Sequence, residues 1–212
     1  MALEHLIFPS GELGANTALF WCDRTREGVL VDPGGEPDEI FDLLLSNGVS
    51  LVTIVLTHAH IDNIAAVGRL REDTSCGVAL HREDWPLWEA IEEQCRELRM
   101  PVPDLPEIDE ALCEGVPVPF GREHLDVMHL PGHSPGHCGF LADELSLCLV
   151  GDACFSSAAG RCDLWRGDET RQERTLDRIQ RFPAHWTLLP GHGPSFSSTD
   201  VPRARRLRST NF

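Results

Sequence analysis

Short apolar runs alternate with polar, turn-forming segments along most of the chain. Runs at positions 6–8, 18–22 and 28–31 predict strands that pair antiparallel. Residues 37–48 then follow a helical pattern, with proline near the start and glycine past the end. The alternation continues with a strand at 51–57, a helix at 63–72 and a strand at 77–81. Strands that alternate with helices indicate an α/β layered fold.

Residues 83–99 form a long amphipathic stretch that predicts a helix carrying Trp85 and Trp88. The proline-rich segment 100–106 cannot continue this helix. Two interpretations of the stretch stay open: its tryptophans pack on the core, or it overhangs a binding site as a lid. The remaining pattern predicts strands near 116–119, 125–130, 137–142, 145–151 and 186–189, a helix over 169–181 and a basic tail over 203–208.

No low-complexity linker divides the 212 residues, so we expect one domain over residues 1–212. No stretch approaches about 18 consecutive apolar residues, and the N-terminus lacks a basic segment followed by an apolar run. The eight cysteines include no C-x-x-C pair and are expected to be reduced core residues. These features predict a cytoplasmic protein that does not enter a membrane.

The formal net charge of −16 opposes binding to nucleic acid, because that affinity comes mainly from Lys and Arg on phosphates. The expected partner is therefore a small-molecule substrate. No oligomeric state is predicted.

The segment Thr-His-Ala-His-Ile-Asp-Asn at 57–63 carries the clearest chemistry in the chain. An extended backbone points residues two apart to the same side, so a strand that ends at Thr57 aims His58 and His60 at one point. Neutral imidazole is the commonest ligand for zinc and a good one for iron. Asp62 falls where the next helix begins, where its carboxylate can cap the helix or coordinate an ion. The segment therefore predicts a metal site.

Three more ligand-type residues follow apolar runs further along the chain. They are His133 in Leu-Pro-Gly-His-Ser-Pro-Gly-His at 130–137, Asp152 after the run 147–151, and His192 in Leu-Leu-Pro-Gly-His-Gly-Pro at 188–194. Strand ends are where α/β proteins collect active sites. One such residue is usually a turn residue, but several in one order predict a shared site.

Together these motifs resemble the metallo-β-lactamase superfamily, whose pattern is H-x-H-x-D-H, then a Gly-His, a Gly-Asp and a late Gly-His. The resemblance covers nearly the whole chain and implies an αββα sandwich with metals at one edge between the two sheets. It implies that His58, His60 and His133 hold metal one, that Asp62 and His192 hold metal two, and that Asp152 bridges them.

One ligand of that pattern is replaced in this chain. The second His of the family's D-H pair is Asn63 here, and a carboxamide oxygen is a weaker ligand for zinc than an imidazole nitrogen. We therefore expect one zinc site that fills and a second that fills weakly, with iron as the alternative metal.

Residues 160–168, Gly-Arg-Cys-Asp-Leu-Trp-Arg-Gly-Asp, resemble the G-R-x-D-x-x-x-G-D segment of compact glyoxalase II-like thioester hydrolases. A metal held by imidazoles lowers the pKa of its bound water from 15.7 to about 7, so attack of metal-bound hydroxide on a thioester is the implied reaction. Asp152 would orient the hydroxide and Asp62 would accept or relay a proton. These two carboxylates are the catalytic candidates, and another acyl compound stays open as substrate.

Two other hypotheses remain beside hydrolysis. A mononuclear iron persulfide dioxygenase would use His58, His133 and Asp152 as a two-His-one-carboxylate set and needs no ligand at position 63. A non-catalytic member of the family would keep the fold and bind a ligand or a structural metal.

Overall fold

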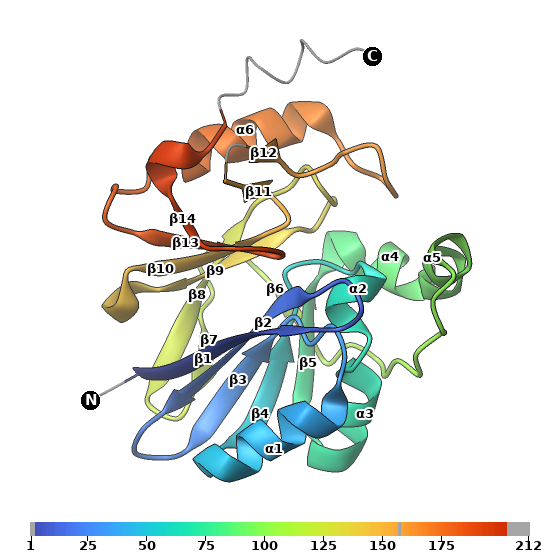
Figure 1. Cartoon of the computed structure of the whole chain (residues 1–212), viewed down its shortest axis with the longest axis vertical. Coiled ribbons are helices and arrows are strands. Elements are labelled where there is room, and N and C mark those ends of the chain that lie inside the picture. The colour runs from blue at the N-terminus through green and yellow to red at the C-terminus, as the bar shows by residue number, and fades with distance from the viewer. Residues whose placement is uncertain (1–2, 157, 203–212) are drawn as a thin grey trace.

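The computed structural model describes residues 3–156 and 158–202. Two six-stranded sheets lie face to face, and helices cover the outer face of each sheet (Figure 1). The layers run helix, sheet, sheet, helix. The αββα sandwich predicted from the sequence is confirmed.

The first sheet takes the N-terminal strands in sequence order. They are β1 (Leu3–Ser10), β2 (Ala15–Cys22), β3 (Glu27–Val31), β4 (Ser50–Val55), β5 (Gly77–His81) and β6 (Glu110–Leu112). The first three pair antiparallel, as predicted, and β3 to β6 pair parallel. Parallel strands end at the same edge of a sheet, so the segments that follow β3, β4 and β5 meet there.

The second sheet is built from the C-terminal half of the chain. In spatial order its strands are β14 (Phe196–Ser197), β13 (Thr187–Pro190), β10 (Leu147–Gly151), β9 (Cys138–Ala142), β8 (Glu123–His129) and β7 (Val118–Phe120). Because β9 lies antiparallel between β8 and β10, and β10 pairs parallel with β13, the strands β8, β10 and β13 run the same way. A small hairpin of β11 (Cys154–Phe155) and β12 (Ala158–Ala159) follows β10.

The helices lie on the outer faces of the two sheets (Figure 1). Those of the first half are α1 (Pro37–Asn47), α2 (Ile61–Ile64), α3 (Val67–Thr74), α4 (Trp85–Glu89) and α5 (Ile91–Leu98). The second sheet is covered by α6 (Glu169–Ile179). Single 3-10 turns are η1 (Arg82–Asp84), η2 (Asp143–Leu145) and η3 (Ser198–Asp200).

Three apolar clusters hold the four layers together. Along β2, Leu19 and Trp21 belong to the cluster between the first sheet and its helices, whereas Ala18 and Phe20 belong to the cluster between the two sheets. This alternation is the two-residue period of a strand that is buried on both faces. A third cluster, which includes Leu176 of α6, joins α6 to the second sheet.

The single helix predicted over 83–99 is wrong, because the chain forms η1, α4 and α5 instead. Pro86 has no N–H and lies in the first turn of α4, where a helix needs none. Ala90, with φ −91° and ψ 19°, separates α4 from α5. Trp88 is buried in the cluster beneath these helices and Trp85 packs against it, so the core-packing interpretation holds for both tryptophans.

The helix predicted over 63–72 is also two helices, α2 and α3. The N–H of Ala66 donates to the carbonyl of Pro33 at 3.1 Å, a tertiary bond that replaces a helical one. The first of the two begins at Ile61, earlier than predicted, and has Asp62 in its first turn. The short strands β6, β11, β12 and β14 hold two or three residues each, too few to show a period, and the sequence does not predict them.

The predicted basic tail over 203–208 lies outside the described residues. Within the described part of the chain, no helix has the length and apolar character that crossing a membrane requires. All eight cysteines are free, and six of them are buried, as predicted for core thiols. The prediction is wrong for Cys113, which is exposed, and for Cys162, which is half-buried.

Candidate metal centre

The six residues predicted as ligands come together where strands of both sheets end. His58 and His60 follow β4, and Asp62 lies in α2 directly after them. From the second sheet, His133 follows β8, Asp152 follows β10 and His192 follows β13. The two sheets face each other, so these segments converge at one edge of the sandwich (Figure 1).

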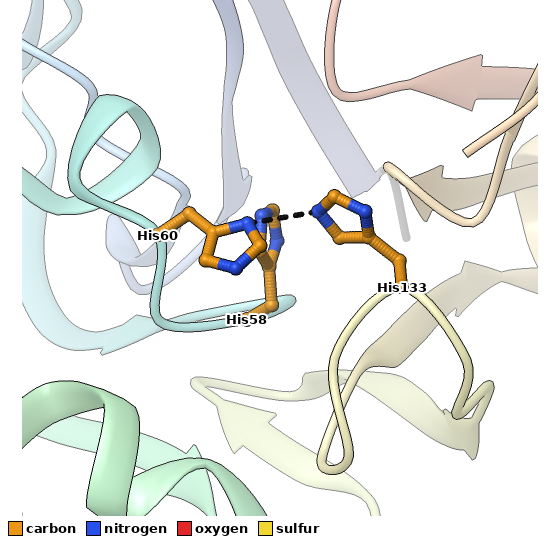
Figure 2. Close-up of side chains that lie close together, drawn as sticks. All are labelled: His58, His60 and His133. Carbon is orange, nitrogen blue, oxygen red and sulfur yellow. Dashed lines mark hydrogen bonds between the residues drawn. The ribbon is translucent and has the colours of Figure 1, made fainter. Parts of the chain in front are cut away.

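Three of these side chains form a compact cluster of imidazoles, which we call the three-imidazole cluster: His58, His60 and His133. One ligand nitrogen of each lies within 4.8 Å of the others, and all three rings are buried. His60 Nδ1 lies 2.9 Å from His133 Nε2, and Figure 2 shows the three rings turned toward one another from two separate loops. Spacing of this kind suits a single ion held by nitrogen ligands.

Hydrogen bonds fix which nitrogen of His58 faces the cluster. The Thr57 hydroxyl donates to Asp32 Oδ2 at 2.6 Å, so its oxygen is left to accept from His58 Nδ1–H at 2.9 Å. The lone pair of His58 is therefore on Nε2. The backbone N–H of Thr57 also donates to Asp32, at 2.7 Å, which anchors the start of the ligand loop.

His133 is oriented in the same manner by a different part of the chain. Its Nδ1–H donates to the carbonyl of Arg161 at 2.8 Å, so the lone pair is on Nε2, the nitrogen that faces His60. Histidines that bind a metal through one ring nitrogen almost always donate a hydrogen bond from the other. The residues after β12 thus support a ligand that follows β8.

Burial controls the charge of the cluster. Burial, followed by the nearby imidazoles, lowers the pKa of His58 well below its usual range. Burial also lowers the pKa of His60, with the charge of His133 as the next cause. The neutral imidazole, which is the form that binds metal, is therefore favoured at neutral pH.

The remaining ligand candidates, Asp62 and His192, are paired with each other. His192 Nε2 lies 3.1 Å from Asp62 Oδ2, and this hydrogen bond raises the pKa of His192 to about 9. Burial acts to raise the pKa of Asp62, but the hydrogen bond from His192 and the neighbouring imidazoles outweigh burial, and the pKa is lowered. The two side chains are therefore an ion pair.

Asp152 lies between the two groups. Its Oδ2 is 3.6 Å from His133 Nε2 and its Oδ1 is 4.0 Å from His192 Nε2. Burial raises the pKa of this carboxyl. A side chain at Gly191 would collide with Oδ1 of Asp152, which explains why the late Gly-His motif begins with glycine.

Asn63 is buried and faces the three-imidazole cluster. Its Nδ2 lies 3.4 Å from His58 Nε2, and its Oδ1 has no hydrogen-bond partner among the described residues. The amide therefore lies beside the lone pair that a metal would use.

The donor set fits a first-row transition metal. It combines three imidazole nitrogens with a nearby carboxylate, and two of its buried atoms, His60 Nε2 and Asp152 Oδ1, have no hydrogen-bond partner in the described structure. Imidazole and carboxylate are the ligands of catalytic zinc sites and of non-haem iron sites. The assignment of each residue to a particular metal stays a prediction.

Asp84 and Gln94 support the ligand loops, and the sequence interpretation missed both. Asp84 accepts hydrogen bonds from Ser134 Oγ at 2.6 Å and Gly136 N at 2.5 Å, beside His133, and from Ala59 N at 3.2 Å. The buried carboxylate of Asp84 therefore connects the loop of His58 and His60 to the loop of His133. Its position soon after β5, like that of the other ligands after their strands, is a signal that the sequence offered.

Gln94 holds the loop of His58 and His60 from the helix side. Its Nε2 donates to Ala59 O at 2.9 Å and Leu87 O at 3.0 Å, and its Oε1 accepts from Ile61 N at 3.2 Å. It lies three residues after Ile91, on the buried stripe of α5. A polar residue on an apolar stripe was the signal in the sequence.

Trp165 and His137 complete the surroundings of the cluster. The Trp165 ring lies 5.1 Å from the His60 ring at 64°, and its Nε1 donates to Glu97 of α5 at 3.0 Å. His137 stacks on His58 at 5.1 Å, and neither of its buried ring nitrogens has a hydrogen-bond partner among the described residues. Aromatic rings thus border the cluster on two sides.

Comparison with known proteins gives a consistent family. The pattern of the metallo-beta-lactamase superfamily matches residues 10–207. The chain is 29% identical over 208 residues to the hydroxyacylglutathione hydrolase GloC of Haemophilus influenzae, with 94% of each chain covered. It is 34% identical over 202 residues to the probable metallo-hydrolase YqgX of Bacillus subtilis, covering 91% of this chain and 90% of that protein. The crystal structure of TTHA1623 in a di-iron-bound form superposes with a TM-score of 0.84 at 34% identity, covering 92% of this chain and 95% of that one.

Proposed function

Because the chain belongs to the metallo-β-lactamase superfamily, whose members are usually hydrolases, we propose that it is a metal-dependent hydrolase of thioesters. The observation that carries this proposal is the three-imidazole cluster with Asp152 beside it. The likeness to GloC over 94% of both chains supports a thioester as the substrate class. The substrate is a small molecule in this proposal.

Each residue has a proposed role. His58, His60 and His133 would hold the first metal, and a metal bound there would supply a water of lowered pKa and polarise the acyl carbonyl. Asp152 accepts a hydrogen bond from the attacking water and orients it. Asp62, kept ionised by His192, accepts a proton.

In this proposal, the buried three-imidazole cluster and the aromatic rings beside it limit the space for the acyl group. Trp165 lies against His60 and is fixed by its hydrogen bond to Glu97, so in this proposal the tryptophan would border the bound acyl group. An apolar wall of this kind limits the access of bulk water and favours an uncharged acyl group.

Zinc is the proposed metal, and iron is the second candidate. A cluster of neutral imidazoles with a carboxylate binds both. The structure of TTHA1623, 34% identical, holds two irons. This observation keeps the oxygenase hypothesis as a second candidate function, since His58, His133 and Asp152 lie together and Asn63 is not needed as its ligand.

The experiment compares one preparation loaded with zinc and one loaded with iron. We expect zinc-loaded protein to cleave S-lactoylglutathione or simple aryl thioesters without consuming oxygen. Asp152→Asn should lose most of this activity, whereas His124→Ala, a change at an exposed histidine of β8, should keep it. Oxygen uptake by iron-loaded protein with glutathione persulfide, together with inert thioesters, would establish the oxygenase instead. Metal binding without either reaction would support the non-catalytic hypothesis.

A further inference from the structure

A second group of ligand-type side chains lies outside the buried centre, at the ends of β5 and β8. His81 ends β5 in the first sheet and His129 ends β8 in the second. Their rings stack at 4.2 Å between centroids and 19° between planes. With Glu83, they offer three ligand atoms that all lie within 4.8 Å of one another. Both histidines are half-buried and Glu83 is exposed, so an ion reaches them from solvent.

The hydrogen bond made by His129 prepares this ring as a ligand. Its Nε2–H donates to the carbonyl of Pro135 at 3.0 Å, so the lone pair is on Nδ1. This is the arrangement that orients His133 at the buried centre, where the carbonyl of Arg161 accepts. A ring nitrogen that donates to a backbone carbonyl is typical of histidines that bind metal through the other nitrogen.

We propose that His81, Glu83 and His129 form a second transition-metal site, on the surface and separate from the buried centre. Two imidazoles and one carboxylate are a ligand set that zinc accepts, with solvent completing the coordination. An ion at this site links the end of β5 in one sheet to the end of β8 in the other. It therefore stabilises the sandwich next to the loop that carries His133.

Two existing contacts compete with the ion and set its affinity. Arg171 of α6 pairs with Glu83 at 2.8 Å, and both side chains are partly exposed. Exposed pairs of this kind contribute little to stability, so an ion displaces the guanidinium readily. His81 Nδ1 accepts a weak hydrogen bond of 3.3 Å from the N–H of Glu83. To bind an ion, His81 must either release this bond and use Nδ1, or move its ring proton to Nδ1 and use Nε2. The site is therefore expected to bind zinc more weakly than the buried centre does.

The site has a direct consequence for metal stoichiometry. If two metal ions are found per chain, the second can be the ion held by His81, Glu83 and His129. The side of the buried centre formed by Asp62 and His192 can then be empty. The proposal does not depend on the proposed catalytic function, since its test measures binding and stability.

The test is a zinc titration of the protein with its buried centre already filled, using a chromophoric chelator as competitor. We expect wild type to bind one zinc more than His81→Ala or His129→Ala, and to gain melting temperature when that zinc is added. The control His124→Ala removes an exposed histidine of the same strand as His129 and should behave as wild type. Equal zinc binding by wild type and by both ligand variants would overturn the proposal.

Arg171→Met gives a test of the opposite sign, which a loss of folding cannot imitate. The substitution removes the competing guanidinium and leaves the N-cap bond from the backbone N–H of Arg171 to Asp168 in place. Zinc affinity at the surface site should rise about two- to fivefold, the change expected when an exposed ion pair worth up to about 1 kcal/mol no longer competes for Glu83. An unchanged affinity would show that Glu83 is not a ligand and would overturn the proposed set.

Discussion

The two sides of the buried centre differ in how they balance charge. On the three-imidazole side, the outward nitrogens of His58 and His133 are bound to Thr57 and Arg161, so the lone pairs on their Nε2 atoms face the cluster and its neutral imidazoles. On the other side, Asp62 and His192 neutralise each other at 3.1 Å. The first arrangement is prepared for a cation from solution, whereas the second already contains one in the protonated His192. A second metal must displace that proton, and Asn63 offers no imidazole to help.

The largest predicted effect comes from removing a ligand on each side in turn. His133→Ala should abolish binding of the tight metal and reduce hydrolysis about a hundredfold or more, since the loss of an outer-shell partner alone costs about 10 to 100-fold. His192→Ala should leave one metal bound and lower the rate less. Both variants are made in a His129→Ala background, which removes the surface site. Elemental analysis measures the metal content of each variant, and a thioester assay measures its rate. Equal loss of metal in the two variants would contradict the difference between the sides.

Gln94→Ala is the next prediction, because it weakens the support of the three-imidazole side alone. The change leaves Ile61 N–H and the carbonyls of Ala59 and Leu87 without partners, which costs about 1 to 3 kcal/mol for each buried group that water does not reach. We expect a loss of roughly 3 kcal/mol in the free energy of unfolding and about 10 to 100-fold weaker binding of the tight metal. Urea unfolding and competition with a chelator measure the two effects.

Gln180→Ala is the matched control for that experiment. Gln180 follows α6, and its side chain donates to Pro202, away from the ligand loops. Its substitution should leave metal affinity unchanged. If Gln94→Ala lowers stability but not affinity, Gln94 supports the fold and does not position the ligands.

Asn63→His tests whether the weaker side can be completed. The new imidazole would lie beside His58, where Asn63 lies now, and should raise metal content from near one toward two per chain in the His129→Ala background. The rate of thioester hydrolysis should rise up to about tenfold if the second ion takes part. A variant that gains no metal would mean that the ion pair of Asp62 and His192, and not position 63, keeps the second ion out.

The smallest predicted effect is a shift in the protonation of His192 after chelation of the metal. Its pKa in the folded protein is raised to about 9 by the hydrogen bond to Asp62. For a raised histidine pKa, the stabilisation is fully present below the unfolded value of about 6.5 and is lost as the pH rises through about 9. NMR titration of the chelated protein should find the ring still protonated at pH 8. Asp62→Asn should bring the pKa back toward its ordinary value, and an unchanged pKa would remove Asp62 as the cause.

The sequence predicted alternating strands and helices and the ligand segments because both depend on local pattern, whereas the order of the layers was implied by the resemblance to the superfamily. The run before Thr57 and the runs before His133 and Asp152 are strands with a clear apolar signature, and a polar residue after such a run is visible without a structure. Figure 2 shows three of the predicted residues assembled from two loops. The residues predicted from the sequence thus lie together in the structure, although the sequence did not predict every element, and their roles as ligands stay predictions.

The errors lie where tertiary contacts override local preference. The bond from Ala66 to the carbonyl of Pro33 divides a helix that has no helix breaker at that point. The bonds from Asp84 and Gln94 to the two histidine loops join segments that are 25 to 52 residues apart in the chain, and a local pattern can mark such a residue but not its distant partner. The surface pair of His81 and His129 was not predicted either, because the two residues end strands of different sheets.

The bond from His133 to the carbonyl of Arg161 also constrains how this protein can evolve. A backbone carbonyl is present whichever side chain stands at position 161, so the exposed side chain at this position is free to diverge while the bond to His133 is kept. An insertion or deletion in the same loop would move the carbonyl and release a histidine of the centre. We therefore expect lineages of this protein to vary at position 161 while the length of this loop is preserved.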